Sequence, residues 1–461
     1  MKQVSPSGRN LIVATELTAE ELWQPFEPGV DGPWDLPAAA HLFRRAGFGA
    51  DRKQLEAAVK KSPQQVVDEL LDVPEPAEFL SEMQTLATAA ISGGNVEPLS
   101  AWWVYRILGT PRQLLEKTVL FWHGHFATGA DKVTEPQLML TQNQLLRRLA
   151  FAGFGELVHQ ISKDPAMLLY LDSASNRKAH PNENYARELM ELFCLGEGQY
   201  TEQDIRELAR CFTGWEVRRG EYRFNRFQHD TGSRAFLGAS GEFSGEQAVD
   251  VVLRQPQTAQ FIVSKMLRFF VLDEPVDVVA LTAPLARQFR DSGLQIRPLL
   301  RTILTSRLFF SRRSVGRRIK SPVELALGLL RCLEGTTNTV GLAKSLQQLG
   351  QGLLYPPSVK GWDGGRTWIN SSTLLGRSNL MRQLITDPNT RFGRQSLPDY
   401  LSARDLREPA EMLAELQLLL FAVPIPLRSR DSILSLMKPR SEAALAEGLH
   451  ALCTLPEFQL C

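Results

Sequence analysis

The stretch NYARELMELFCL, Asn184–Leu195, is the clearest helix in the sequence. At about 100° per residue, Asn184, Glu188 and Glu191 fall on one polar stripe, and the large apolar residues fall on the other side. Leu195 lies on the polar stripe as well. This position predicts that part of the polar face is buried.

Outward from this helix, the signals that start helices recur along the chain. Ser62-Pro63-Gln64-Gln65 and Ser321-Pro322-Val323-Glu324 both place Ser at the N-cap, Pro first and a Gln or Glu third. Thr110-Pro111-Arg112-Gln113 repeats the pattern, and looser versions begin at Thr134 and Thr201. Each signal precedes an apolar run of helical period, which predicts a mainly α, multi-helix globular array.

A few stretches depart from the helical pattern. Trp215 to Phe227 alternates around Arg219-Gly220, which predicts one small β-hairpin. Residues 231–245 and 350–370 are rich in Gly, Ser or Pro and are expected to be long irregular loops. The second of these loops is expected to lie near the functional site.

The chain is expected to divide into three parts along its 461 residues. Residues 1–35 are broken by Pro and Gly and predict an extended arm. Residues 36–400 form the main helical domain, which begins with a helix from about Pro37 to Gly47 and carries the polar site. Residues 401–461 return to amphipathic helices and predict a C-terminal helical tail packed on the main domain.

Composition narrows the classes of function and the compartment. Lys plus Arg (52) and Asp plus Glu (51) nearly cancel, so nucleic-acid binding is not expected. The five cysteines are scattered without CxxC spacing, which is typical of reduced, buried thiols. No apolar signal segment is visible in residues 1–23 and no stretch is long and apolar enough to span a membrane. The expected compartment is the cytoplasm, with export alongside a partner left open.

Four of the seven histidines fall in three short polar clusters. The clusters are WHGHF at Trp122–Phe126, HPNENYARELME at His180–Glu191, and His229-Asp230. Within a helix, His123 and His125 would point about 200° apart, so one ion could not bind both. Gly124 is a natural helix end, and a turn there would let both imidazoles face one point. The alternative is a helix-end histidine favoured by the dipole, with the other packed on Trp122 or Phe126.

The other two clusters can supply carboxylates and a third histidine. Glu188 and Glu191 are neighbours at i and i+3, although they could also form a solvated face on which Arg187 pairs with Glu191. His229 and Asp230 follow the predicted hairpin, and the alternative there is a loop histidine bonded to the backbone. Such a combination of histidines and carboxylates suits Zn, Mn or Fe.

These clusters predict one candidate site. The predicted metal ligands are His123, His125, Glu188 and His229. Asp230 or Glu191 is predicted to orient a metal ligand or to act as a general base, and Arg187 is expected to hold an anionic group of the substrate. No P-loop, Rossmann glycine pattern or serine nucleophile elbow is present, so no nucleotide cofactor is expected.

The sequence resembles the bacterial family catalogued as domain of unknown function 1800. The matching segments are HLFRRAGFG from His41, FWHGHF from Phe121, NENYARELMELFCLGEGQYTEQD from Asn182, FTGW from Phe212, His229-Asp230 with Phe236-Leu237-Gly238, and GWDGGRTWIN from Gly361. The resemblance implies a largely α-helical fold and a gene often found beside that of a sulfatase-like protein. It implies no catalytic residues.

Three functions follow as hypotheses. The first is a metal-dependent hydrolase that acts on an anionic or carbohydrate-type substrate. The second is a non-haem iron enzyme that uses oxygen with the same ligands. The third is a non-enzymatic helical partner or maturation factor of the sulfatase-like protein, in which the segment Asn182–Glu191 is a buried polar network.

Overall fold

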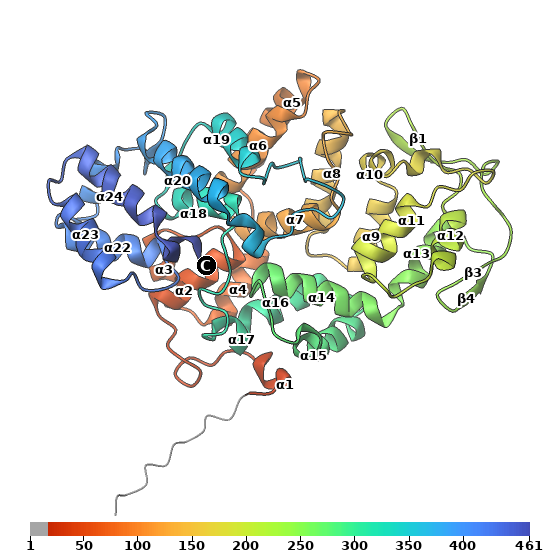
Figure 1. The fold of residues 1–461 in the computed structure, drawn as a ribbon, viewed down its shortest axis with the longest axis horizontal. Helices are drawn as coiled ribbons and strands as arrows, with labels where there is room; N and C mark the ends of the chain where they lie inside the picture. The colour runs from red at the N-terminus through yellow and green to blue at the C-terminus, as the bar shows by residue number, and fades with distance from the viewer. Residues whose placement is uncertain (1–16) are drawn as a thin grey trace, which may run out of the picture.

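The computed structural model describes residues 17–461 and shows a mainly α-helical protein, as the sequence predicts. Within this range there are 24 α-helices and three two-stranded antiparallel sheets. Residues 1–16 of the predicted N-terminal arm lie outside the described residues. Figure 1 shows α7 and α14 near the middle of the molecule, with α22 to α24 at one end of its long axis and α9 to α13 at the other.

The bounds of the elements follow the chain. The first helices are α1 (Ala19–Leu22), α2 (Leu36–Ala46), α3 (Arg52–Ala58), α4 (Pro63–Asp72), α5 (Ala77–Ser92), α6 (Glu97–Gly109), α7 (Gln113–His125) and α8 (Pro136–Leu149). The next are α9 (Phe154–Ser162), α10 (Pro165–Tyr170), the 3₁₀ turn η1 (Ser173–Ser175), α11 (Asn184–Glu188), the π-helix η2 (Leu189–Cys194), α12 (Glu202–Cys211), α13 (Gly245–Leu253), α14 (Pro256–Phe270), α15 (Val278–Asp291) and α16 (Ile296–Thr305). The last are α17 (Arg307–Phe310), α18 (Pro322–Cys332), α19 (Thr339–Gln348), η3 (Gly365–Trp368), α20 (Ser371–Thr386), α21 (Leu397–Ser402), α22 (Pro409–Leu420), α23 (Leu427–Met437), α24 (Glu442–Thr454) and η4 (Pro456–Gln459).

The strands form three small sheets. They are β1 (Trp215–Arg218) with β2 (Glu221–Phe224), β3 (Arg234–Phe236) with β4 (Ala239–Gly241), and β5 (Gly335–Thr336) with β6 (Arg391–Phe392). The predicted hairpin is confirmed as β1–β2, and its two turn residues, Arg219 and Gly220, both have positive φ. The prediction of a loop over 231–245 is wrong in part, because β3 and β4 pair within it.

Most predicted helix starts are confirmed as capping boxes. Ser62, Thr201 and Ser321 each accept a hydrogen bond from the N3 backbone, and the N3 side chain accepts one in return. The prediction at Thr110 is wrong, since Thr110 ends α6 and Arg112 occupies the N-cap of α7. The Thr110 hydroxyl instead accepts the Arg112 N–H at 3.0 Å, so it still orders the turn between these helices.

The helix predicted over 184–195 is not a regular α-helix throughout. It begins as α11 and changes to the π-helix η2, in which the Leu195 N–H bonds to the Met190 carbonyl five residues earlier. A π-helix turns less per residue than an α-helix, so the predicted 100° spacing drifts beyond Glu188. Leu195 is buried, as the sequence predicts.

The buried apolar side chains form one connected core from Leu22 to Phe458. Residues near the N-terminus join it, since the Trp23 indole donates to the Leu281 carbonyl at 2.7 Å and the Phe26 N–H donates to Thr305. No helix among residues 17–461 is both long and apolar enough to cross a membrane. The core surrounds α7, whose side chains are almost all buried.

Candidate functional site

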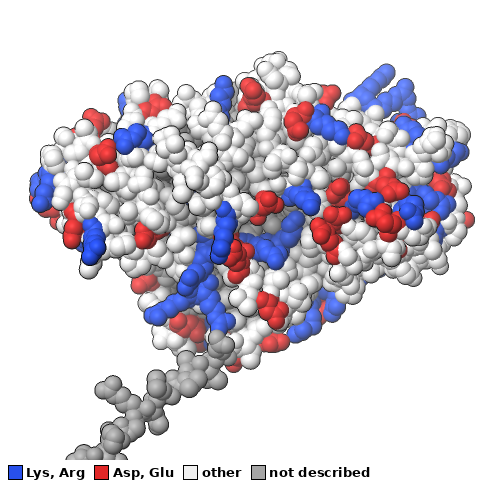
Figure 2. Space-filling view, in the orientation of Figure 1, with Lys and Arg blue, Asp and Glu red and all other residues white. Residues whose placement is uncertain are grey.

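A pocket of about 420 Å³ lies between α7, α14 and the irregular segment 350–370. Its lining combines aromatic rings with charged groups. The aromatic residues are Phe121, Phe269, Trp362 and Trp368, the basic ones are Lys265, Arg268, Arg318, Lys360 and Arg366, and the acidic ones are Asp273, Glu274 and Asp363. Figure 2 shows Lys and Arg side chains gathered around a hollow near the middle of this face. The segment expected to lie near the functional site therefore forms one wall of this pocket.

Two glycines allow the segment to lie directly on α7. A Cβ at Gly361, where φ is +76°, would stand 2.0 Å from the carbonyl oxygen of Gly124. A Cβ at Gly124 would stand 3.3 Å from the Trp362 ring. Gly124 therefore permits a close approach between α7 and the segment 350–370, and it does not end the helix, because α7 continues to His125.

Two basic groups of the pocket have no acidic partner. Arg318 lies 3.7 Å from Asp273, and Arg366 lies 2.7 Å from Glu274. By contrast, neither Lys265 nor Arg268 forms an ion pair among the described residues. Unpaired cations in an aromatic-lined pocket favour an anionic ligand, because such a ligand supplies the missing charge.

Lys265 has a particular environment within the pocket. It is half-buried on α14, its amine lies 5.2 Å from the Phe261 ring centre, and its hydrogen bond to the Leu192 carbonyl is long, at 3.5 Å. Burial, together with the neighbouring Arg268, lowers the pKa of Lys265 to about 8. A substantial fraction of this amine is therefore neutral near pH 8.

His123 and His125 do not face one point. Since α7 runs through Gly124, the two rings leave the helix in different directions. His123 packs edge-on against Trp103 at 5.3 Å, whereas His125 lines the pocket and its Nε2 lies 3.0 Å from the Phe193 carbonyl. The prediction that Gly124 ends α7 and brings both imidazoles together is wrong.

The burial of these histidines makes folding sensitive to acid. Burial lowers the pKa of His123 from 6.5 to about 4, and burial together with Lys265 lowers that of His125 as well. The unfolded chain then binds protons that the folded chain does not, so stability falls as the pH drops from about 6.5 towards 4.

We expect the free energy of unfolding to be lower at pH 5 than at pH 7, with His123 contributing about 2 kcal/mol of the difference. Urea unfolding of wild type and His123→Phe at both pH values measures this contribution of His123. The variant should show a smaller difference between the two pH values, because its ring cannot titrate. An equal difference in the two proteins would contradict the assignment.

Glu188 and Glu191 lie near each other on the half-buried face of α11 and η2. Burial raises the pKa of Glu188, and the Glu191 carboxylate raises it further, while Arg187 and Lys360 oppose the shift. Glu191 accepts a hydrogen bond from the Tyr200 hydroxyl at 2.9 Å. Lys360, which lines the pocket, is thus within electrostatic reach of Glu188, although Glu188 is not itself a lining residue.

Arg187 is already occupied by carboxylates. Its two terminal nitrogens donate to both oxygens of Glu202 at 2.8 Å, and Glu183 lies 3.3 Å away. The predicted pairing of Arg187 with Glu191 is not observed. An anionic substrate would have to displace Glu202 to reach this guanidinium.

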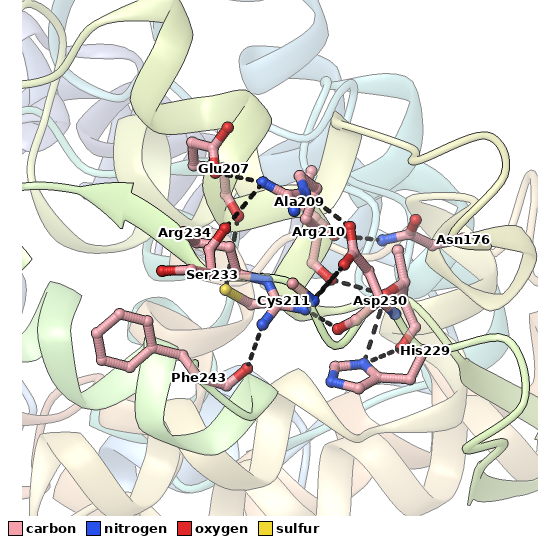
Figure 3. Close-up of polar contacts among 12 residues, drawn as sticks. Asn176, Glu207, Ala209, Arg210, Cys211, His229, Asp230, Ser233, Arg234 and Phe243 are labelled. Carbon is pink, nitrogen blue, oxygen red and sulfur yellow. Dashed lines mark hydrogen bonds and ion pairs between the residues drawn. The ribbon is translucent and has the colours of Figure 1, made fainter. Parts of the chain in front are cut away.

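His229 and Asp230 belong to a separate network beside α12. The Asp230 carboxylate accepts from Arg210 at 2.7 Å and from the Gly232 N–H at 2.8 Å, as Figure 3 shows in part. The Arg210 hydrogen bond lowers the pKa of Asp230. His229 Nδ1 lies 2.8 Å from the Thr213 carbonyl, which is the backbone-bonded alternative considered from the sequence. Asp230 thus links Arg210 of α12 to Arg234 of β3, which lies 3.8 Å from the same carboxylate.

The four predicted metal ligands therefore lie in different surroundings. Among residues 17–461 no group of three or more His, Cys, Asp or Glu side chains could hold a metal ion. The structure brings Glu188 near Glu191 but gives His123, His125, Glu188 and His229 no common centre. Binding of Zn, Mn or Fe stays a prediction.

The sequence did contain a signal for Lys265, a pocket residue that is not among the predicted site residues. In FIVSKMLRF, Lys265 stands four residues from Phe261 and from Phe269, so it lies between two aromatic rings on one helix face. A lysine in such a position is shielded from water and lacks an acidic neighbour on its own helix. Its role as a pocket group depends on the distant segment 350–370, which no local pattern reveals.

The fold and the pocket define a class: a helical protein whose central helix is buried and whose basic, aromatic-lined pocket is closed on one side by a glycine-rich segment. A family model described as protein of unknown function (DUF1800) matches residues 41–460. The chain belongs to this family, as its sequence resemblance implies. No curated protein and no solved structure matches it.

Proposed function

We propose that the protein binds a small anionic molecule, of the sugar-phosphate or sugar-sulfate type, in the pocket between α7, α14 and the segment 350–370. The observation that carries this proposal is the pair of unpaired cations, Lys265 and Arg268, in a pocket walled by aromatic rings. Cations recognise phosphate or sulfate oxygens, and the faces of aromatic rings accommodate the apolar face of a sugar.

The size of the pocket agrees with this class of ligand. Its volume of about 420 Å³ falls in the range typical of small-molecule sites. Arg268 is exposed at the mouth, Lys265 lies deeper, and Trp368 is buried in the wall. An anionic group would therefore be held by Arg268 while the rest of the ligand reaches towards Lys265.

The test is calorimetric titration with glucose 6-phosphate, glucose 6-sulfate and neutral glucose. We expect the charged sugars to bind at least tenfold more tightly than glucose. Arg268→Gln should weaken their binding by about 10- to 100-fold, because a charge-assisted hydrogen bond contributes about 1.5–3 kcal/mol. Arg428→Gln on α23, outside the pocket, is the matched control. Equal binding of glucose, or no effect of Arg268→Gln, would contradict the proposal.

Metal-dependent hydrolysis is the first of the three functions expected from the sequence. Elemental analysis of protein purified without chelator tests it, beside His123→Ala and His229→Ala. Near-stoichiometric Zn or Mn that is lost in both variants would support hydrolysis, and Fe with substrate-dependent oxygen uptake would support oxygen chemistry. The third prediction, a sulfatase-like partner, is tested by co-purification of the two proteins.

A further inference from the structure

Lys265 differs from the other lysines of the pocket region in its contacts. Lys360 is exposed, and its amine lies 3.9 Å from Glu197. Lys265 instead has an aromatic neighbour and one long contact to a carbonyl. Lys117, which is buried on α7, pairs directly with Glu324. Lys265 is thus a pocket amine that no carboxylate holds in the charged form.

The elements around Lys265 explain why it stays unpaired. Phe261 and Phe269 flank it on α14, and the carbonyl of Leu192 comes from η2. The neighbouring cation Arg268 adds like charge and disfavours protonation, as the lowered pKa of Lys265 reflects. A lysine attacks carbon only through its neutral amine, so this environment favours nucleophilic chemistry.

We propose that Lys265 is a nucleophilic amine that forms an imine with an anion carrying an aldehyde or ketone group. The inference rests on the proposed function, because Arg268 would hold the anionic end of such a ligand. It narrows the substrate class to carbonyl-bearing anions, which include the open-chain form of a sugar phosphate.

The chemical step balances without an oxidant or a reductant. The Lys265 nitrogen forms a bond to the carbonyl carbon, and the carbonyl oxygen becomes a hydroxyl. The two amine protons leave with that oxygen as water, and a C=N bond remains. The aromatic walls formed by Phe269 and Trp362 limit the access of water to this bond.

Pyridoxal 5′-phosphate, an anionic aldehyde, is the probe for this amine. The full-length wild-type protein is incubated with it, reduced with sodium borohydride and mapped by peptide mass spectrometry. We expect Lys265 to be labelled at least tenfold faster than exposed lysines such as Lys53 and Lys344, and excess glucose 6-phosphate to slow this labelling. Labelling spread evenly over the lysines would overturn the proposal.

Labelling and binding measured on the wild type and on two variants separate this inference from the proposed function. Lys265→Arg replaces the nucleophilic amine by a guanidinium and should lose the adduct. Lys360→Arg, in the same pocket, should keep the adduct at Lys265. Binding of glucose 6-phosphate without any adduct in wild type would overturn the imine and leave the proposed function intact, whereas the absence of both would overturn both. The wild-type map requires no variant, so a misfolded variant does not prevent the decision.

Discussion

The Glu324→Gln variant is expected to lose about 3–5 kcal/mol of its free energy of unfolding, because it leaves the buried Lys117 without a counter-ion and Arg318 with Asp273 alone. Glu324 is buried at the start of α18 and pairs with both Lys117 and Arg318. Burial by itself would raise the pKa of Glu324, but Arg318 and Lys117 outweigh it and hold the pKa well below its ordinary range. Urea unfolding followed by circular dichroism at pH 7 measures the loss.

Ser321, the N-cap residue of α18, provides the matched control for the loss of the Glu324 charge. Glu324 also accepts the Ser321 N–H at 2.8 Å in the capping box, and a glutamine preserves that bond. Ser321→Ala removes the hydroxyl of the cap without changing the charge and should cost only about 1 kcal/mol. If Glu324→Gln costs no more than Ser321→Ala, the ion pairs do not stabilise the fold as we infer.

Gly361→Ala is expected to displace the segment 350–370 from α7 and to open the pocket. The new methyl group would stand 2.0 Å from the Gly124 carbonyl oxygen, and the residue would keep a φ of +76°. A left-handed conformation costs about 1–2 kcal/mol in a residue with a Cβ, and overpacking adds about 1–3 kcal/mol. We therefore expect a loss of about 2–5 kcal/mol, together with a change in tryptophan fluorescence as Trp362 leaves its contact with α7.

Gly364→Ala separates strain from collision in the same segment. Its φ is +78°, but no heavy atom lies within 4 Å of the Cβ that would be added. With a ψ of −172° this is a backbone conformation that only glycine adopts readily, so the variant should carry a conformational cost of about 1–3 kcal/mol and no cost of collision. If Gly361→Ala behaves like Gly364→Ala in stability and fluorescence, the close approach to Gly124 does not hold the segment in place.

Local patterns determined most of the helices. Ser62 and Ser321 cap helices because a serine oxygen satisfies an N–H that has no partner at any helix start. Apolar residues also recur at the helical period in α15, Val278–Asp291, and in α16, Ile296–Thr305. These signals depend on residues that are close in the chain, so they can be recognised without knowledge of the fold.

The candidate site could not be predicted in the same way. Scarce histidines near carboxylates predicted one centre, but the direction of each side chain depends on whether α7 ends at Gly124 and on the turn per residue in η2. Both features are set by tertiary packing. Gly124 is required by the segment that carries Gly361, more than two hundred positions along the chain.

The sequence by itself determined the helical class, the caps, the hairpin β1–β2 and the family, because each depends on local order or on motifs that can be read directly. Only the tertiary structure decided what surrounds each polar group. His123 packs against tryptophans, and Asp230 pairs with Arg210. Glu324, which also takes part in a helix cap, is a buried counter-ion. Lys265 and Arg268 lie in a pocket without an acidic partner among the described residues. The physical reason is that charge, burial and partner are properties of the whole packed chain, and residues distant in sequence supply them.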